Sequence, residues 1–204
     1  KELEKNLFSL DYVMAWGDDS TIDSIGNTVH PTTRFVPFHF EFGAYLVDSE
    51  TQENYDEELL DNIAKDFSWG DQLLCFSPLV MLIEASENTD EFLEDLASKL
   101  EEYTDGYQMG VVPKEERMKI TRTKKIARDS GNLVSDWENS TTVIQKEGLE
   151  KSDVAEFHSF RFVKAHRVDN IQNSLDKVGD IRNLQEFILA TSGSSRESLR
   201  DRIL

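Results

Sequence analysis

Apolar residues recur at helical spacing in several segments of the first half of the chain. Residues 1–16 carry leucines and a methionine at spacings of 4, 3 and 4, which is typical of an amphipathic helix. Two further apolar stripes follow capping boxes, one formed by Asn54 with Glu57 and the other by Asn88 with Glu91. The pattern therefore predicts three amphipathic helices in this part of the chain.

Between and around these helices lie apolar segments that are too short or too broken to be helical. They are Phe35 to Val47, Gln72 to Glu84 and Tyr107 to Val112, and their aromatic and β-branched content favours strands. The resulting order of strand, helix, strand, helix, strand implies a sheet with helices on at least one face. Such an order allows parallel neighbours joined by right-handed crossovers.

The second half of the chain shows a different pattern. Met118 to Ile126, Thr141 to Gln145 and Phe157 to Val168 are strand-like and are separated by turns rich in Ser, Gly and Asn. We expect these segments to form an antiparallel meander. A helical spacing from Ile171 to Ile188, which is continuous unless Gly179 divides it, and a capping box that begins at Ser194 predict C-terminal helices. The predicted fold class is α+β, with α/β as the alternative.

The size and charge of the chain bear on its division into domains. With 204 residues, of which 38% are hydrophobic, the chain can bury one substantial core, so we expect a single domain over residues 1–204. Residues 1–113 hold 25 acidic and 5 basic side chains, a net charge of −20, whereas residues 114–204 hold 15 and 17, a net of +2, and the two sum to −18. This change suggests two lobes, 1–113 and 114–204, and a charged partner for one of them.

The cysteine content indicates the compartment and one structural role. Cys75 is the one cysteine of the chain, so no intrachain disulfide can form. It stands in the apolar run Leu73 to Phe76, which predicts a buried thiol without a nucleophilic role. We expect an intracellular protein, cytoplasmic or nuclear. The longest apolar stretch, Leu79 to Ile83, is far below the ~20 residues of a membrane helix, and no secretory leader opens the chain.

No motif in the sequence forces a particular chemistry. The histidines are scattered, and the glycines form neither a phosphate-binding loop nor a nucleophile elbow. The acidic cluster of Asp18, Asp19 and Asp23 does not complete a calcium loop, and a solvated acidic loop is the favoured interpretation. Glu84 follows a strand as in metal-dependent nucleases, but no Glu-x-Lys follows it. We therefore predict no catalytic residue, no metal site and no cofactor.

Basic residues are concentrated between Lys114 and Arg128. An edge strand protected by lysines is the favoured interpretation, and the alternatives are a contact surface for phosphate or an acidic partner, or packing beside the acidic half. Phe160 to Lys164 is similar to the aromatic-x-aromatic-valine core of an RNA-recognition strand, although a core position for both rings is favoured. The candidate binding residues are Lys119, Arg122, Lys124, Lys125, Arg128, Arg161, Lys164 and Arg167.

Three classes of function remain open from the sequence. The favoured one is a non-catalytic binding or regulatory subunit, which docks on a protein partner with a basic surface for the acidic half. The second is a nucleic-acid-associated protein that uses the basic segment 114–128 as a contact or its acidic half as a nucleic-acid mimic. The third is a metal-dependent nuclease or hydrolase whose carboxylates lie far apart in the sequence. The sequence does not indicate an oligomeric state.

Overall fold

The structure of the protein, a computed structural model, comprises two compact units, residues 1–41 and residues 42–204. The residues that the structure describes are 10–39, 41–137, 141–149, 158–179 and 184–191, with Gly193, Arg196, Glu197 and Leu199. The expected single domain, with its alternative division between residues 113 and 114, stays a prediction. Each unit is described by itself.

The first unit is a strand–helix–strand element. Strand β1 (Tyr12–Gly17) pairs in parallel with β2 (Arg34–His39), and α2 (Asp19–Gly26) connects them. Along β1 the buried side chains of Val13 and Ala15 alternate with exposed ones, which is the period of two expected of a strand with one covered face. The helix predicted over residues 1–16 is therefore wrong from Tyr12 onward, and residues 1–9 lie outside the described residues.

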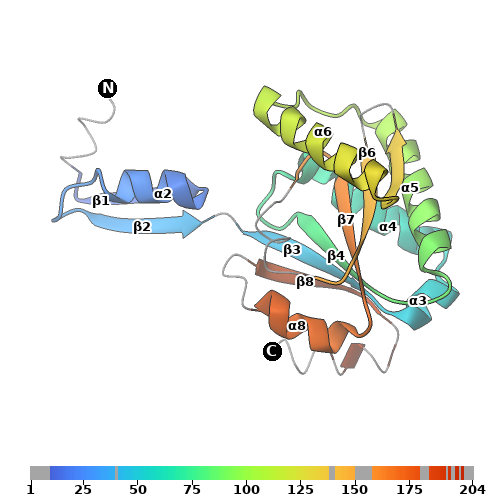
Figure 1. The fold of residues 1–204 in the computed structure, drawn as a ribbon. Helices are drawn as coiled ribbons and strands as arrows, with labels where there is room; N and C mark the ends of the chain where they lie inside the picture. The colour runs from blue at the N-terminus through green and yellow to red at the C-terminus, as the bar shows by residue number, and fades with distance from the viewer. Residues whose placement is uncertain are drawn as a thin grey trace. The chain divides into compact units, whose positions relative to one another are not determined.

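The second unit is built on a mixed sheet of six strands in the order β5-β6-β7-β4-β3-β8 (Figure 1). All neighbouring strands are parallel except β5 and β6, which are antiparallel. The strands are β3 (Phe42–Val47), β4 (Pro78–Glu84), β5 (Leu133–Trp137), β6 (Thr141–Glu147), β7 (Phe162–Val168) and β8 (Leu184–Ala190). Helices together with a mixed, mostly parallel sheet are compatible with an α/β class.

Helices cover both faces of this sheet. The helices are α3 (Ser49–Asn54), α4 (Glu57–Ser68), the short 3₁₀ helix η1 (Trp69–Gln72), α5 (Thr89–Gly106), α6 (Lys114–Asp129) and α8 (Ile171–Gly179). Figure 1 shows α4 behind the sheet and α8 in front of it. The main core lies between the sheet and the helices α4 and α5, where Phe67 and Phe92 are fully buried. A smaller cluster packs α6 against β6 and β7 through Ala127, Ile144 and Phe162.

The helices α4 and α5 confirm two of the sequence predictions. The apolar stripes behind both predicted capping boxes lie in these helices and face the main core. The caps themselves differ. In α4 the carboxylate of Asp56, and not Asn54, accepts the backbone N–H of Leu59 at 2.9 Å, and at the start of α5 the side chain of Asn88 makes no cap hydrogen bond.

The segment 118–126 is helical, so its prediction as an edge strand is wrong. It forms the middle of α6, where Ile120, Lys124 and Ala127 face the sheet at helical spacing. Lys119, Arg122 and Lys125 are exposed, whereas Lys124 is buried, so the alternation of charges along the sequence does not reflect two faces of a strand. The apolar stripe is difficult to recognise because one of its three positions is a lysine.

Three other predicted elements also differ from the structure. Residues 107–112 form no strand, and Val111 in this loop is 90% exposed. The predicted antiparallel meander is wrong because β6 and β7 pair in parallel. The helix predicted from residue 171 to 188 ends at Gly179, and residues 184–190 instead form β8 beside β3. The terminal helix predicted from Ser194 falls mostly outside the described residues.

Candidate functional site

Cys75 lies on a tight turn at the amino edge of the parallel sheet in the second unit. The backbone N–H of Ser77 donates to the carbonyl of Leu74 at 2.9 Å, so Cys75 and Phe76 are the two central residues of a β-turn. The turn leads directly into β4, and the N–H of Gly43 in β3 donates to the carbonyl of Ser77 at 2.8 Å. The thiol is exposed, so the predicted buried cysteine is wrong.

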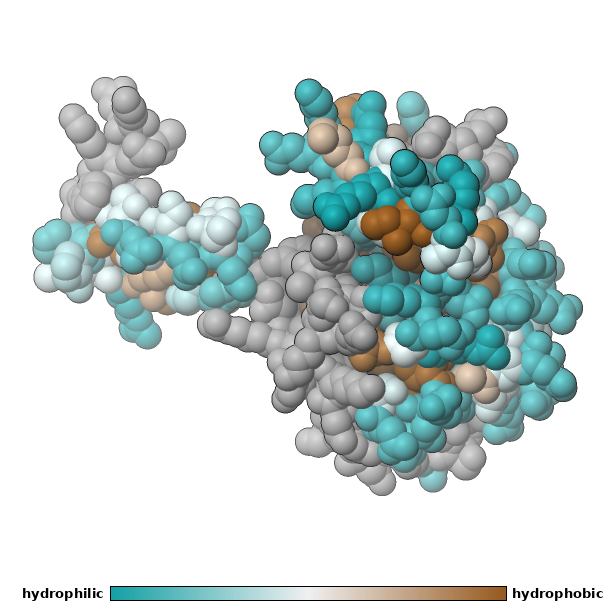
Figure 2. Space-filling model, viewed as in Figure 1, coloured by the Kyte–Doolittle hydropathy of each residue, from teal (hydrophilic) through white to brown (hydrophobic). Residues whose placement is uncertain are grey.

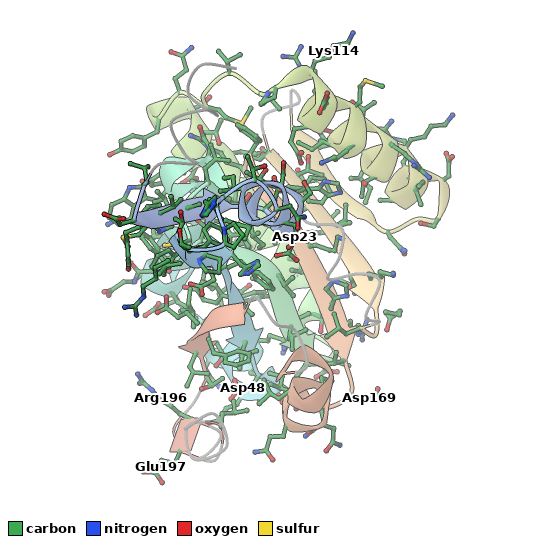
Figure 3. All side chains as sticks on the ribbon, turned by 90° about the vertical axis from the view of Figure 1, so that its left-hand side faces the viewer. Asp23, Asp48, Lys114, Asp169, Arg196 and Glu197 are labelled. Atoms are coloured by element: carbon green, nitrogen blue, oxygen red, sulfur yellow. The ribbon has the colours of Figure 1, made fainter. Side chains whose placement is uncertain are left out.

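This edge of the sheet is opposite to the one where the strands end. Asp48 and Asp169 follow the carboxyl ends of β3 and β7, and Figure 3 shows both at the end of the second unit opposite to Lys114. Ligands of open α/β sheets most often bind at the carboxyl ends of the strands. A search of the sequence for functional residues at the carboxyl ends of strands would therefore miss a thiol at the amino edge of the sheet.

The side chain of Gln72 fixes the position of this turn. Gln72 is fully buried, and its amide nitrogen donates to the carbonyls of Pro78 at 2.9 Å and Phe162 at 3.1 Å. Its amide oxygen accepts the N–H of Phe162 at 2.7 Å. One side chain thus joins the residues that follow the turn to the first residue of β7, and three buried backbone groups depend on it.

The backbone is strained in both of the segments that Gln72 connects. Asp71, Gln72, Phe160 and Arg161 all have positive φ, between 52° and 65°. For residues other than glycine such a conformation costs about 1 kcal/mol or more, and such residues cluster at functional sites. The N–H of Phe160 donates to the carbonyl of Asp71 at 2.8 Å, so the two strained segments hold each other.

A buried ion pair links the same two segments. Arg161 is 3% exposed, and its Nε donates to Asp71 at 3.2 Å while its Nη1 donates to Thr104 at 2.8 Å. The second carboxylate oxygen of Asp71 accepts the N–H of Gly110 at 2.8 Å. The pair therefore fastens η1 to β7 and to the loop behind α5. Burial of this kind is tolerated because both charges are paired and hydrogen-bonded.

Large apolar side chains surround Cys75 on the surface. Trp69, Leu73 and Phe76 are 60%, 58% and 46% exposed. The rings of Trp69 and Phe76 pack edge to face with centroids 6.4 Å apart. Exposed apolar groups of this size next to one another usually mark a binding surface. The viewed face of the second unit in Figure 2 shows small groups of hydrophobic residues among hydrophilic ones.

The predicted binding residues lie at different places and do not form one surface. Arg122 and Lys125 are exposed on α6, where Lys119 pairs with Glu116 at 3.2 Å. Lys124 and Arg128 both bind Asp136, at 2.7 and 2.9 Å. Arg161 and Lys164 are buried, and Arg167 on β7 donates to the carbonyl of Ser86 at 3.2 Å. A role of these residues in binding stays a prediction.

Several acidic side chains that could have served as metal ligands have other partners. Asp18 caps α2 by accepting the N–H of Thr21 at 2.8 Å, and Glu84 accepts the N–H of Ser49 at 3.2 Å. Asp136 is neutralised by its two basic partners. Within the described ranges, no three side chains of His, Cys, Asp or Glu lie where they could share one metal ion.

Among the helices that the structure describes, none combines the length and the apolar character needed to cross a membrane.

The comparisons with known proteins concern the whole chain. A model of the acyl-CoA reductase (LuxC) family matches residues 1–204. No curated protein matches the chain.

Solved structures show the same fold at low identity. An NAD-dependent aldehyde dehydrogenase from Burkholderia multivorans matches with a TM-score of 0.74 and 10% identity over 94% of this chain and 38% of that one. An aldehyde dehydrogenase from Brucella melitensis biovar abortus matches with a TM-score of 0.69 and 13% identity over 100% and 44%. An indole-3-acetaldehyde dehydrogenase with NAD+ matches at 0.66 and 13% over 97% and 43%. The chain thus spans about two fifths of these proteins.

The family match overturns the function that we favoured from the sequence. The prediction of a non-catalytic binding or regulatory subunit is wrong. The alternative predictions, a nucleic-acid-associated protein and a metal-dependent nuclease or hydrolase, are also not supported by the family match. The sequence contained one usable signal for the missed cysteine. The apolar run that holds Cys75 is bounded by Gln72 and by Ser77-Pro78, and polar and turn-forming residues at both ends of so short a run favour a turn over a buried strand.

Proposed function

Because this chain belongs to the LuxC family of acyl-CoA reductases, we propose that it carries the nucleophile of such an enzyme and that this nucleophile is Cys75. An acyl-CoA reductase must take an acyl group from a thioester. A cysteine thiolate does this well because sulfur is a strong nucleophile and the exchange of one thioester for another is nearly balanced in energy. Cys75 is the one thiol of the chain.

The exposure of Cys75 on a rigid turn is the observation that carries the proposal. A nucleophile must reach the carbonyl carbon of its substrate and must be held in one geometry. The thiol is exposed, while Gln72 and Ser77 on either side of it are buried and hydrogen-bonded. A merely structural cysteine needs neither property.

The acyl transfer follows from this geometry. The thiol of Cys75 gives up its proton and its sulfur attacks the thioester carbonyl. The bond from that carbon to the CoA sulfur breaks, CoA leaves as a thiol after taking up one proton, and the acyl group remains on Cys75. Within the described residues, the backbone N–H groups of Cys75 and Phe76 donate no hydrogen bond. Both stand beside the thiol, where they can stabilise the negative oxygen of the tetrahedral intermediate.

The apolar side chains around the thiol favour an apolar acyl group. Trp69, Leu73 and Phe76 would cover hydrocarbon that otherwise stays in contact with water. The exposed indole and phenyl rings contribute most of this area.

The reductive half of the reaction needs a hydride donor of the nicotinamide class. The strand-to-helix turn of the first unit does not fit the pyrophosphate of such a cofactor, since the N-terminus of α2 is already capped by the carboxylate of Asp18. Hydrogen bonds from the hydroxyl of Ser20 and the N–H of Thr21 hold the pKa of Asp18 below its usual range, and Asp19 adds a second carboxylate. We assign no step of hydride transfer to the residues of this chain.

The release of CoA tests the proposal. The protein incubated with a fatty acyl-CoA and no hydride donor should release about one equivalent of CoA per chain, as measured by chromatography. Cys75→Ala should release none, while Ser24→Ala, which changes an exposed residue of α2, should release as much as the unchanged protein. Release that persists in Cys75→Ala would exclude Cys75 as the nucleophile.

A further inference from the structure

A pocket of ≈ 420 Å³ opens beside η1, the helix that precedes the turn carrying Cys75. It lies where the ends of α4 and α5 meet η1 and the start of β7, and this volume is in the range of small-molecule sites. Its lining includes Lys65, Ser68, Trp69, Tyr103, Tyr107 and Arg161.

Trp69 connects this pocket to the reactive thiol. The side chain lines the pocket, and its ring packs against Phe76, the residue that follows Cys75. A ligand in the pocket would therefore need to extend past one aromatic pair to bring its end to the sulfur.

Two polar groups in the wall donate to no acceptor among the described residues, and one of them is buried. Ser68 is 2% exposed, and its hydroxyl makes no hydrogen bond with the part of the chain that the structure describes. Arg161 uses Nε and Nη1 for Asp71 and Thr104, and its Nη2 donates to no acceptor among the described residues. A buried donor without a partner, such as the Ser68 hydroxyl, is costly, so the pocket is suited to a ligand that brings acceptor oxygens.

The charge of the pocket interior favours neutral acceptors. Asp71 already balances Arg161, and α4 and α5 both end here, so their carbonyl ends disfavour an anion in the interior. The stacked rings of Tyr103 and Tyr107, with centroids 4.7 Å apart, offer a flat apolar wall. Amide groups provide neutral carbonyl acceptors and lie flat against aromatic rings.

The mouth of the pocket differs from its interior. Lys65 is exposed, lies one helical turn before Trp69, and forms no ion pair with the described residues. It is therefore free to bind a phosphate at the part of the pocket wall that α4 provides.

We propose that this pocket binds the 4′-phosphopantetheine arm of the acyl thioester, with its amides between Ser68, Trp69 and Arg161 and its phosphate at Lys65. The inference rests on the proposed function, because the arm has value only if it delivers a thioester to Cys75. Coenzyme A and acyl carrier proteins both carry this arm, and the pocket recognises the chemistry that they share.

A series of thioesters with the same acyl group tests the inference through the rate constant for acylation of Cys75. The acyl thioesters of N-acetylcysteamine, pantetheine, CoA and an acyl carrier protein lengthen the arm step by step. Lys65→Gln should slow acylation by acyl-CoA about 10-fold and leave acyl-pantetheine unchanged, because pantetheine has no phosphate. Ser68→Ala should slow acyl-pantetheine and acyl-CoA about 5-fold.

Lys99→Gln provides the matched control, because it removes the same charge from α5, where Lys99 pairs with Glu57 and Glu102. It should leave all four rate constants unchanged. Slower acylation of Cys75 in Lys65→Gln with acyl-CoA or with the acyl carrier protein supports the inference. Of these two thioesters, the one that acylates the unchanged protein faster identifies the carrier.

Two failures can be told apart. If the N-acetylcysteamine thioester acylates Cys75 but Lys65→Gln slows all thioesters equally, or none, the pocket does not bind the arm and the proposed function stands. If none of the four thioesters acylates Cys75, the proposed function itself is wrong and the pocket inference fails with it.

Discussion

At the scale of single residues, Gln72 is the side chain on which the geometry of Cys75 depends most. It donates to two backbone carbonyls and accepts one backbone N–H in a site without water access. Replacing Gln72 with a side chain of the same shape that cannot donate two hydrogen bonds should therefore lower the stability of the protein and shift the turn.

Gln72→Glu should lower the free energy of unfolding by about 3 kcal/mol, because it leaves backbone carbonyls unpaired and places a carboxyl group in the core. Urea unfolding measures the loss. Asn62→Asp, which introduces the same change on the exposed face of α4, should stay within about 0.5 kcal/mol of the unchanged protein. A loss below about 1 kcal/mol in Gln72→Glu would contradict the role given to this side chain.

At the scale of elements, strand β3 and the turn that carries Cys75 approach each other closely at Gly43. A Cβ atom at this position would lie 3.0 Å from the carbonyl oxygen of Phe76, which belongs to the backbone of the turn and cannot rotate away. Glycine at this place lets the turn and the strand pack together.

Gly43→Ala should therefore shift the turn by a few tenths of an ångström and slow the acylation of Cys75 about 10-fold or more, because catalysis is sensitive to small misplacements. The rate constant with an acyl-CoA measures the effect. Gly106→Ala is the matched control, since nothing lies within 4 Å of the added methyl group. Equal rates for both variants would show that the contact at Gly43 does not position the thiol.

The elements also show what the sequence could predict and what it could not. The helices α4 and α5 were predictable because a full apolar stripe follows a recognisable start, and β4 because its apolar run is too short for a helix. Helix α6 was missed because the buried stem of Lys124 takes a place in its apolar stripe. Strand β8 was missed because its apolar residues continue the helical spacing of α8 by coincidence.

The candidate site was harder to predict than the fold. The contacts that hold it join residues up to 90 positions apart, such as Gln72 with Phe162 and Asp71 with Arg161. Such pairs have no local signature, and the left-handed backbone at Gln72, Phe160 and Arg161 contradicts the ordinary preference of these residue types.

At the scale of the whole molecule, the net charge of −18 opposes the approach of an anionic substrate. The phosphates of CoA are repelled at long range by this charge, whereas a single lysine at the pocket acts at short range. Salt should weaken the long-range repulsion first.

Acylation by acyl-CoA should therefore become several-fold faster as salt is raised from about 0.01 to 0.1 M, over which the screening length falls from about 30 to 10 Å. Stopped-flow mixing with acyl-CoA at a series of salt concentrations measures this dependence. The neutral N-acetylcysteamine thioester should react at the same rate throughout. A slowing with salt for acyl-CoA would mean that local attraction outweighs the charge of the whole molecule.

The transfer of an acyl group to Cys75 is the central claim and can be measured directly. After incubation with a fatty acyl-CoA in the absence of a hydride donor, the intact protein should gain the mass of one acyl group, and peptide mapping should place it on Cys75. The account predicts one adduct on this residue and none in Cys75→Ala. An unmodified protein, or an acyl group found on another residue, would contradict it.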